Sequence, residues 1–253
     1  MFLADVLLLL AAGFAGGTVN AIAGGATFFT FPAMLAVGIP PVTANASNTV
    51  ALCPASLVAA WAQRRDLADL GRHLVPLSVI GVLGGAIGAV SLLLTSDRAF
   101  MVLVPFLLLG ATLLFALSPR LLALIRARQA HDGRFRASPP TMAVTAVASA
   151  YGGFFGAGLG ILLLATLSLA GLDRLSTANA VKNLLSSAVY LVAVVIFVVS
   201  DAVVWWATLV MLPGALLGGY AGARLARRLP QRVFRAIVIG VGSLLTVWYF
   251  IKL

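Results

Sequence analysis

The chain consists largely of long hydrophobic runs separated by short polar connections, and this pattern limits what it can fold into. A membrane-crossing helix requires about 20 apolar residues. Two runs, at 3–38 and 141–172, are too long for one straight crossing. Of the 253 residues 62% are hydrophobic and 9% charged, whereas a soluble domain carries roughly 25% charged residues. The sequence therefore predicts an all-α integral membrane protein with eight hydrophobic segments, the other six being 43–62, 74–95, 99–118, 177–199, 203–224 and 233–251.

The chain also repeats itself at a fixed spacing. VTANASN at 42–48 corresponds to STANAVK at 176–182, and LGGAIGA at 83–89 corresponds to LGGYAGA at 217–223. Both pairs are offset by 134 residues, as are Arg98 and Arg232. Duplicated hydrophobic units are typical of secondary transporters. We predict a first membrane repeat at 1–119, a basic cytoplasmic connection at 120–140 and a second membrane repeat at 141–253.

The arginines indicate how the two halves are oriented. Cytoplasmic loops are enriched in Lys and Arg. The connection 63–73 is basic, but its equivalent in the second half, 200–202, has no basic residue. The connection 96–98 has a single arginine, whereas its equivalent, 224–235, has five. Because the bias is exchanged between equivalent loops, we predict that the two homologous repeats are inverted and that both termini face outward. The connections predicted to be cytoplasmic are 63–73, 120–136 and 224–235.

Opposite orientations require an odd number of crossings in each half. We therefore predict that the first segment of each half is broken or re-entrant, entering the membrane and returning on the same side. Eight full crossings with parallel repeats are the alternative. Glycine clusters interrupt both overlong runs, at Gly16, Gly17, Gly24 and Gly25 in the first and at Gly152, Gly153, Gly156, Gly158 and Gly160 in the second.

These interruptions are where we expect a binding site. Exposed backbone groups inside a bilayer are tolerated where they line a cavity, and helix N-termini beside a break attract anions. Lys182 is the only basic residue well within a span, and charge at such depth usually marks function. For LGGAIGA and LGGYAGA we expect close helix packing instead. The predicted substrate-binding residues are Asn20, Gly24, Gly25, Thr27, Asn45, Asn48, Gly156, Gly158, Gly160, Asn179, Lys182 and Asn183.

Other classes of function fit the sequence less well. No carboxylate is evident well inside a span, which disfavours a cation transporter or proton relay. An intramembrane enzyme would need a nucleophile with its base, an acid pair or a metal cluster, so we predict no catalytic residue, metal or cofactor. The basic residues flank spans rather than forming a stripe on a soluble module, so nucleic acid is not an expected partner. An anion channel remains an alternative, although two opposed halves suit alternating access better, and faces of small residues are compatible with a homodimer.

The run NAIAGGATFFTFPAMLAVGIPPVTANASN, with GFFGAGLG and TANAVKN, resembles the sulfite exporter TauE/SafE family over essentially the whole chain. The resemblance implies a permease of the bacterial inner membrane for sulfur-containing or organic anions such as sulfite or sulfonates. In that membrane, the termini that the arginines predict to face outward would be periplasmic. Ala26 and Thr27 stand where the family often has a longer glycine run, and Ala157 where it often has proline, which leaves the specific substrate open. Asn20, Gly24, Gly25 and Asn48 match the first motif, and Phe155, Gly156, Gly158, Gly160, Lys182 and Asn183 match the second.

Overall fold

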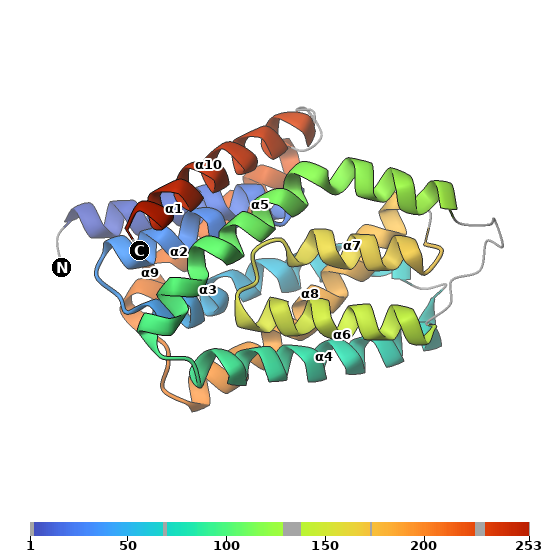
Figure 1. Ribbon diagram of the computed structural model, residues 1–253, viewed down its shortest axis with the longest axis horizontal. Coiled ribbons are helices and arrows are strands. Elements are labelled where there is room, and N and C mark those ends of the chain that lie inside the picture. Colours follow the sequence, from blue (N-terminus) through green and yellow to red (C-terminus); the bar gives the residue numbers. More distant parts are fainter. Residues whose placement is uncertain (1–2, 68–69, 129–137, 173, 226–230, 253) are drawn as a thin grey trace.

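A computed structural model describes residues 3–67, 70–128, 138–172, 174–225 and 231–252, and within these ranges it contains helices and no strand (Figure 1). The all-helical prediction is thus confirmed. The first half contains α1 (Leu3–Ala23), α2 (Thr27–Ala36), α3 (Pro41–Ala62), the 3-10 helix η1 (Arg64–Leu67), α4 (Gly71–Leu93) and α5 (Asp97–Arg128). The second half contains α6 (Pro139–Phe154), α7 (Leu159–Leu169), α8 (Leu175–Val199), α9 (Trp205–Leu225) and α10 (Gln231–Ile251).

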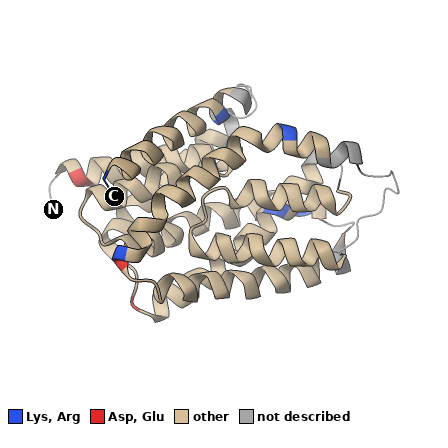
Figure 2. Cartoon of the chain, viewed as in Figure 1, with Lys and Arg blue, Asp and Glu red and all other residues tan. Residues whose placement is uncertain are grey.

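The helices have the length and surface expected of membrane spans. Large apolar side chains such as Ile87, Val147 and Leu209 are more than half exposed on the helix surfaces, as suits contact with lipid. Charged residues are few along the described helices, and α1 begins at the end of the molecule at which α10 ends (Figures 1 and 2). In the described chain, four helices are long and apolar enough to cross a bilayer, over Leu3–Ala21, Leu74–Leu93, Asp97–Leu124 and Ser176–Val199.

Two exposed tryptophans mark the ends of spans on opposite sides of the molecule. Trp61, near the end of α3, lies under the guanidinium of Arg64, 4.0 Å from Cζ to the ring centroid. Trp248, near the end of α10, lies 4.7 Å from the Lys252 ammonium. Tryptophan beside a basic side chain is typical of the interface between hydrocarbon and water. Each pair therefore identifies one edge of the membrane-embedded part.

Both overlong runs are broken at their glycines, as the sequence predicted. Gly24, between α1 and α2, has φ 77°, and Gly156 and Gly158, between α6 and α7, have φ 82° and 80°. Glycine adopts such positive φ values at little cost, whereas other residues are strained there. α1 packs against α2 and α6 packs against α7, and the chain reverses between α6 and α7 (Figure 1).

The helices of the second half follow those of the first at the offset seen in the sequence. Pro41 begins α3 and Leu175 begins α8, and Asp97 begins α5 and Gln231 begins α10, each pair 134 residues apart. α1 packs against α9 and the equivalent pair, α6 and α4, also packs together, while α3 contacts α8 and α5 contacts α10. Each of these contacts joins a helix of the first predicted repeat to a helix of the second.

The predicted connection between the repeats begins within a helix. α5 continues to Arg128, so residues 120–128 of the connection at 120–140 are helical rather than loop. Residues 129–137 and 226–230, which carry other parts of the predicted cytoplasmic connections, lie outside the described residues.

The paired glycine motifs bring helix backbones into contact. A Cβ atom on Gly84 of α4 would lie 2.6 Å from the carbonyl oxygen of Ala146 on α6. A Cβ atom on Gly222 of α9 would lie 2.5 Å from the carbonyl oxygen of Thr18 on α1. Real Cβ atoms essentially never approach closer than 3.0 Å, so only glycine fits at these crossings. The packing role predicted for LGGAIGA and LGGYAGA is confirmed.

We expect Gly84→Ala to lower the thermal unfolding temperature of the purified protein in detergent. The added methyl group must push α4 away from α6, and overpacking of this kind costs about 1–3 kcal/mol. Gly110→Ala is the matched control, because nothing lies within 4 Å of its Cβ position on α5 and alanine is the better helix former. Equal unfolding temperatures for the two variants would contradict the close contact between α4 and α6.

Candidate functional site

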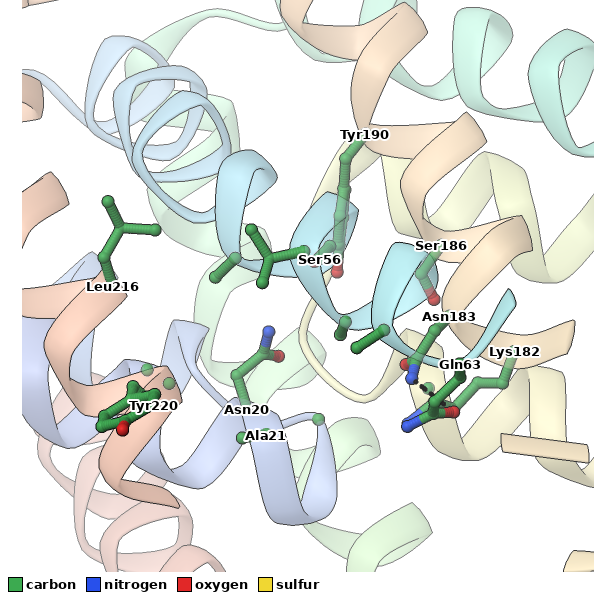
Figure 3. A pocket seen from close by; sticks show the side chains of 18 residues that line it. Asn20, Ala21, Ser56, Gln63, Lys182, Asn183, Ser186, Tyr190, Leu216 and Tyr220 are labelled. Atoms are coloured by element: carbon green, nitrogen blue, oxygen red, sulfur yellow. Dashed lines mark hydrogen bonds between the residues drawn. The ribbon is translucent and has the colours of Figure 1, made fainter. Parts of the chain in front are cut away.

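A cavity of about 320 Å³ lies between α1, α3, α8 and α9, where residues of both halves meet (Figure 3). Its volume is near the lower end of the ~300–1,000 Å³ range of small-molecule sites. Apolar residues such as Ala55, Val58 and Leu216 form part of its wall. Its polar lining residues are Asn20, Ser56, Gln63, Lys182, Asn183, Ser186, Tyr190 and Tyr220.

The two helix breaks meet at this cavity. Gly24 of the first break and Gly160, in the first turn of α7 after the second break, both line it, and a Cβ atom on Gly24 would lie 3.6 Å from the Cα atom of Gly160. α2 and α7 begin directly after the breaks and are 10 and 11 residues long. The first turn of a helix has backbone N–H groups without intrahelical partners, and it carries the positive end of the helix dipole. The breaks therefore bring two helix N-termini close to the cavity.

Lys182 on α8 is the charged residue among the described residues that line this cavity. None of these lining residues is a carboxylate that could neutralise it. Its side chain is 9% exposed, and its stem passes Gly160, where a Cβ atom would lie 3.4 Å from Lys182 Cδ. Within the described ranges, the structure gives Lys182 neither a hydrogen bond nor an ion pair. A buried ammonium without a counter-charge is costly. The cavity is therefore electrostatically suited to an anion.

A pair of side-chain amides lies beside Lys182 (Figure 3). Asn183 Nδ2 donates a hydrogen bond of 3.2 Å to Gln63 Oε1. This bond joins α8 to the end of α3 and orients the Gln63 amide, because its oxygen is held by Asn183. The Gln63 Nε2 group keeps two protons that are available for donation. The pair thus adds neutral donors to the charge of Lys182.

Side chains from three helices satisfy the backbone of the second break. Tyr151 Oη donates to the carbonyl oxygen of Ala157 at 2.8 Å, and Tyr190 Oη donates to that of Gly156 at 3.3 Å. Asn45 Nδ2 donates to the carbonyl oxygen of Phe154 at 2.8 Å. These carbonyl groups have left the regular helix, and unpaired backbone groups are costly in an apolar medium. Tyr190 both lines the cavity and supports the break.

The structure brings together part of the set of residues predicted from the sequence. Asn45 supports the end of α6, and Gly25 packs where a Cβ atom would lie 3.0 Å from Phe115. Five predicted residues line the cavity, namely Asn20, Gly24, Gly160, Lys182 and Asn183. The other predicted residues are not among its lining: Gly25, Asn45, Gly156, Gly158, the buried Thr27 and Asn48, and the half-buried Asn179. Substrate binding by any of these residues stays a prediction.

Several cavity residues were missed by the sequence analysis. Ser186 and Tyr190 follow Lys182 at intervals of four residues, which places all three on one face of α8. This spacing was visible in the sequence. Gln63 lies directly after the end of α3, seven residues beyond Ser56, whereas the charge pattern of the sequence puts it in the basic connection 63–73.

Comparison with known proteins agrees with this architecture. The family model described as "Sulfite exporter TauE/SafE" matches residues 9–249. A "Probable membrane transporter protein" of Haemophilus influenzae is 28% identical over 240 residues, covering 94% of this chain and 92% of the relative. The "Probable membrane transporter protein YfcA" of Escherichia coli is 28% identical over 232 residues, covering 91% and 84%. No solved structure matches the chain.

We expect Tyr151→Phe to destabilise the protein by about 1–3 kcal/mol, because it leaves the buried carbonyl oxygen of Ala157 without its partner. Tyr249→Phe is the matched control, since no hydrogen bond of its hydroxyl is found among the described residues. Thermal unfolding in detergent measures both variants. If the two variants unfold at the same temperature, the hydroxyl of Tyr151 does not support the break.

Proposed function

We propose that this chain, which belongs to the sulfite exporter TauE/SafE family of membrane transporters, is a secondary transporter for a small sulfur-containing or organic anion in the bacterial inner membrane. The observation that carries the proposal is the cavity at the meeting point of the two helix breaks, with Lys182 as its charged lining residue. The curated relatives are named as transporters, which agrees with transport rather than catalysis.

The cavity supports an anion by charge and by hydrogen-bond donors. The Lys182 ammonium has three donors and no acceptor, and the Gln63 amide nitrogen adds two donors. The N-termini of α2 and α7 contribute partial positive charge. The oxygens of sulfite or a sulfonate group accept hydrogen bonds from several directions at once. One ammonium neutralises one negative charge, so a monoanion leaves the loaded cavity neutral and keeps the cost of crossing the membrane low.

The proposed arrangement is an inverted pair of repeats. The α1–α2 and α6–α7 hairpins then contribute no net crossing, and the three long helices that follow each hairpin give an odd number of crossings per half. The positive-inside rule places 63–73 and 224–235 in the cytoplasm, and it places both termini in the periplasm. The direction of the equivalent helices α3 and α8 supports this: Asn183, near the start of α8, bonds to Gln63, directly after the end of α3, and Val204, after the end of α8, bonds to Ser47, near the start of α3.

We expect Lys182→Met to abolish transport while the protein stays folded. Methionine fills the same space against Gly160 without the charge, so its unfolding temperature should be unchanged or higher, because no buried ammonium remains to be desolvated. Anion uptake by proteoliposomes, measured beside the thermal unfolding curve, separates the two effects. Lys252→Met is the matched control, because Lys252 is exposed beside Trp248 near the C-terminus. Full transport by Lys182→Met would remove the proposed site.

The class of substrate can be tested by thermal stabilisation of the purified protein. Sulfite, thiosulfate, sulfoacetate and taurine are the candidate ligands, and at 100 times its dissociation constant a ligand stabilises by about 2.7 kcal/mol. We expect stabilisation by at least one anion, and its loss in Lys182→Met. Stabilisation by a metal cation or by an amine without an acidic group, with none by any anion or sulfonate, would overturn the proposal.

The topology is tested by single cysteines in a Cys53→Ala background. Arg64→Cys and Val233→Cys should react with a membrane-impermeant thiol reagent only from the cytoplasmic side, and Lys252→Cys only from the periplasmic side. All three positions are exposed, so labelling in detergent provides the control. Labelling of Val233→Cys from outside would favour eight crossings with parallel repeats.

A further inference from the structure

The place in the second half that corresponds to the cavity is filled by aromatic rings. α1 and α6 are equivalent helices, and three positions on the cavity side of α1 carry a glycine, an amide and a methyl group. The same positions on α6 carry three aromatic side chains. At the 134-residue offset, Gly17, Asn20 and Ala21 correspond to Tyr151, Phe154 and Phe155.

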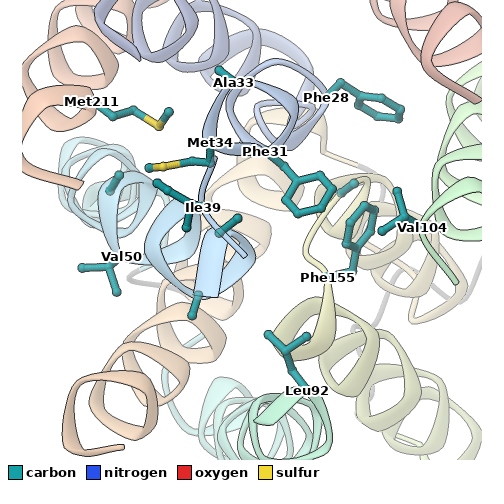
Figure 4. Close-up of a cluster of buried hydrophobic side chains, with 14 of the residues drawn as sticks. Phe28, Phe31, Ala33, Met34, Ile39, Val50, Leu92, Val104, Phe155 and Met211 are labelled. Atoms are coloured by element: carbon teal, nitrogen blue, oxygen red, sulfur yellow. The ribbon is translucent and has the colours of Figure 1, made fainter. Parts of the chain in front are cut away.

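The aromatic cluster, defined as Phe31, Phe100, Phe154 and Phe155, joins α2, α5 and the end of α6. Figure 4 shows two of its members, Phe31 and Phe155. Its rings pack edge to face: the centroids of Phe31 and Phe155 are 5.8 Å apart, those of Phe31 and Phe100 6.0 Å, and those of Phe100 and Phe154 5.6 Å. Phe31 and Phe100 are completely buried, and Phe155 is 1% exposed. Rings from three separate helices therefore pack against one another here, and such contacts separate when one of the helices moves.

The cavity and the aromatic cluster lie toward opposite ends of the molecule. The cavity takes its α3 residues from the end of that helix, next to the basic connection 63–73. Phe100 lies near the beginning of α5. The side chain of Asp97, the first residue of α5, accepts a hydrogen bond from the backbone N–H group of Val42 at the start of α3, which is the other end of that helix. The cavity is thus on the side of the basic connection, and the cluster is on the side of the termini.

Two buried amides indicate that the closed region is not an ordinary apolar core. Asn45 and Asn48 are 0% and 1% exposed, and their Oδ1 atoms have no hydrogen-bond partner in the described part of the chain. Buried polar atoms are nearly always paired. Asn45 is attached to the cluster through its bond to the Phe154 carbonyl group. At the 134-residue offset Asn48 corresponds to Lys182. Asn48 therefore has, in the first half of the chain, the position that Lys182 has in the second half beside the cavity.

We propose that the aromatic cluster is the outer gate of the transport path, and that Asn48 faces an aqueous cavity when the gate opens. The proposal rests on the proposed function, because it treats the two halves as inverted repeats that exchange conformations. In the present structure the cavity lies on the side of the basic connection 63–73, and the buried rings of the aromatic cluster lie toward the beginning of α5. When the gate opens, the unpaired amide oxygens of Asn45 and Asn48 gain water as a partner.

The experiment measures access to Asn48 from the outer side. In a Cys53→Ala background, Asn48→Cys is labelled in intact cells with a membrane-impermeant thiol reagent. We expect slow labelling with the gate intact and at least a tenfold faster rate after adding Phe100→Ala. Phe100→Leu, which removes less volume, is the second variant and should raise the rate less. Phe28→Ala is the matched control, because Phe28 is an equally buried ring in an edge-to-face pair with Phe115 outside the cluster.

The outcomes separate the gate from the transport function. Equal labelling rates in the Phe100→Ala and Phe28→Ala backgrounds would overturn the gate, even if Lys182→Met abolishes transport. Faster labelling with Phe100→Ala supports the gate, even if Lys182→Met still transports and the anion site is wrong. Thermal unfolding of each labelled variant shows that the reagent reaches a folded protein, and labelling that rises only with loss of the folded state also counts against the gate.

Discussion

A helix that is interrupted inside an apolar medium must find partners for the backbone groups it exposes, and this requirement organises the structure. The second break obtains its partners from Tyr151 on α6, Tyr190 on α8 and Asn45 on α3. Each partner belongs to a different helix, so the break is held at the point where the two halves meet. The same residues that stabilise the break therefore fix the position of the cavity beside Gly24 and Gly160.

The glycine contacts determine which helices can move together. α9 lies against the backbone of α1, and α4 lies against that of α6. Contacts this close transmit a shift of one helix to its neighbour, because no flexible side chain separates them. Each hairpin is thereby coupled to a long helix of the opposite half. Within the proposed transport cycle, movement of one hairpin relative to the other carries α4 or α9 with it and changes the space on both sides of the breaks.

The sequence predicted the parts of the structure that depend on local physics. Span lengths follow from apolar runs, and the breaks follow from Gly24, Gly156 and Gly158, whose positive φ values few other residues tolerate. The exact lining of the cavity depends on how α3, α8 and α9 cross, which a single sequence does not reveal. Gln63 was therefore missed, and so was the bond by which Asn45, a predicted substrate ligand, holds the end of α6. Both residues act through partners more than 100 positions away.

The two halves have the same order of helices, but equivalent positions carry different side chains. Lys182 in one half corresponds to Asn48 in the other, and Asn20 corresponds to Phe154. Had the two sets of side chains been identical, exchanging the conformations of the halves would give states of equal free energy. In the proposed cycle, one state packs the aromatic rings together and keeps the ammonium beside the cavity, whereas the other separates the rings and hydrates the amides. Because burial of aromatic surface is favourable, the proposed gate favours the state in which the rings are packed, and the difference between the halves gives the proposed cycle a preferred state.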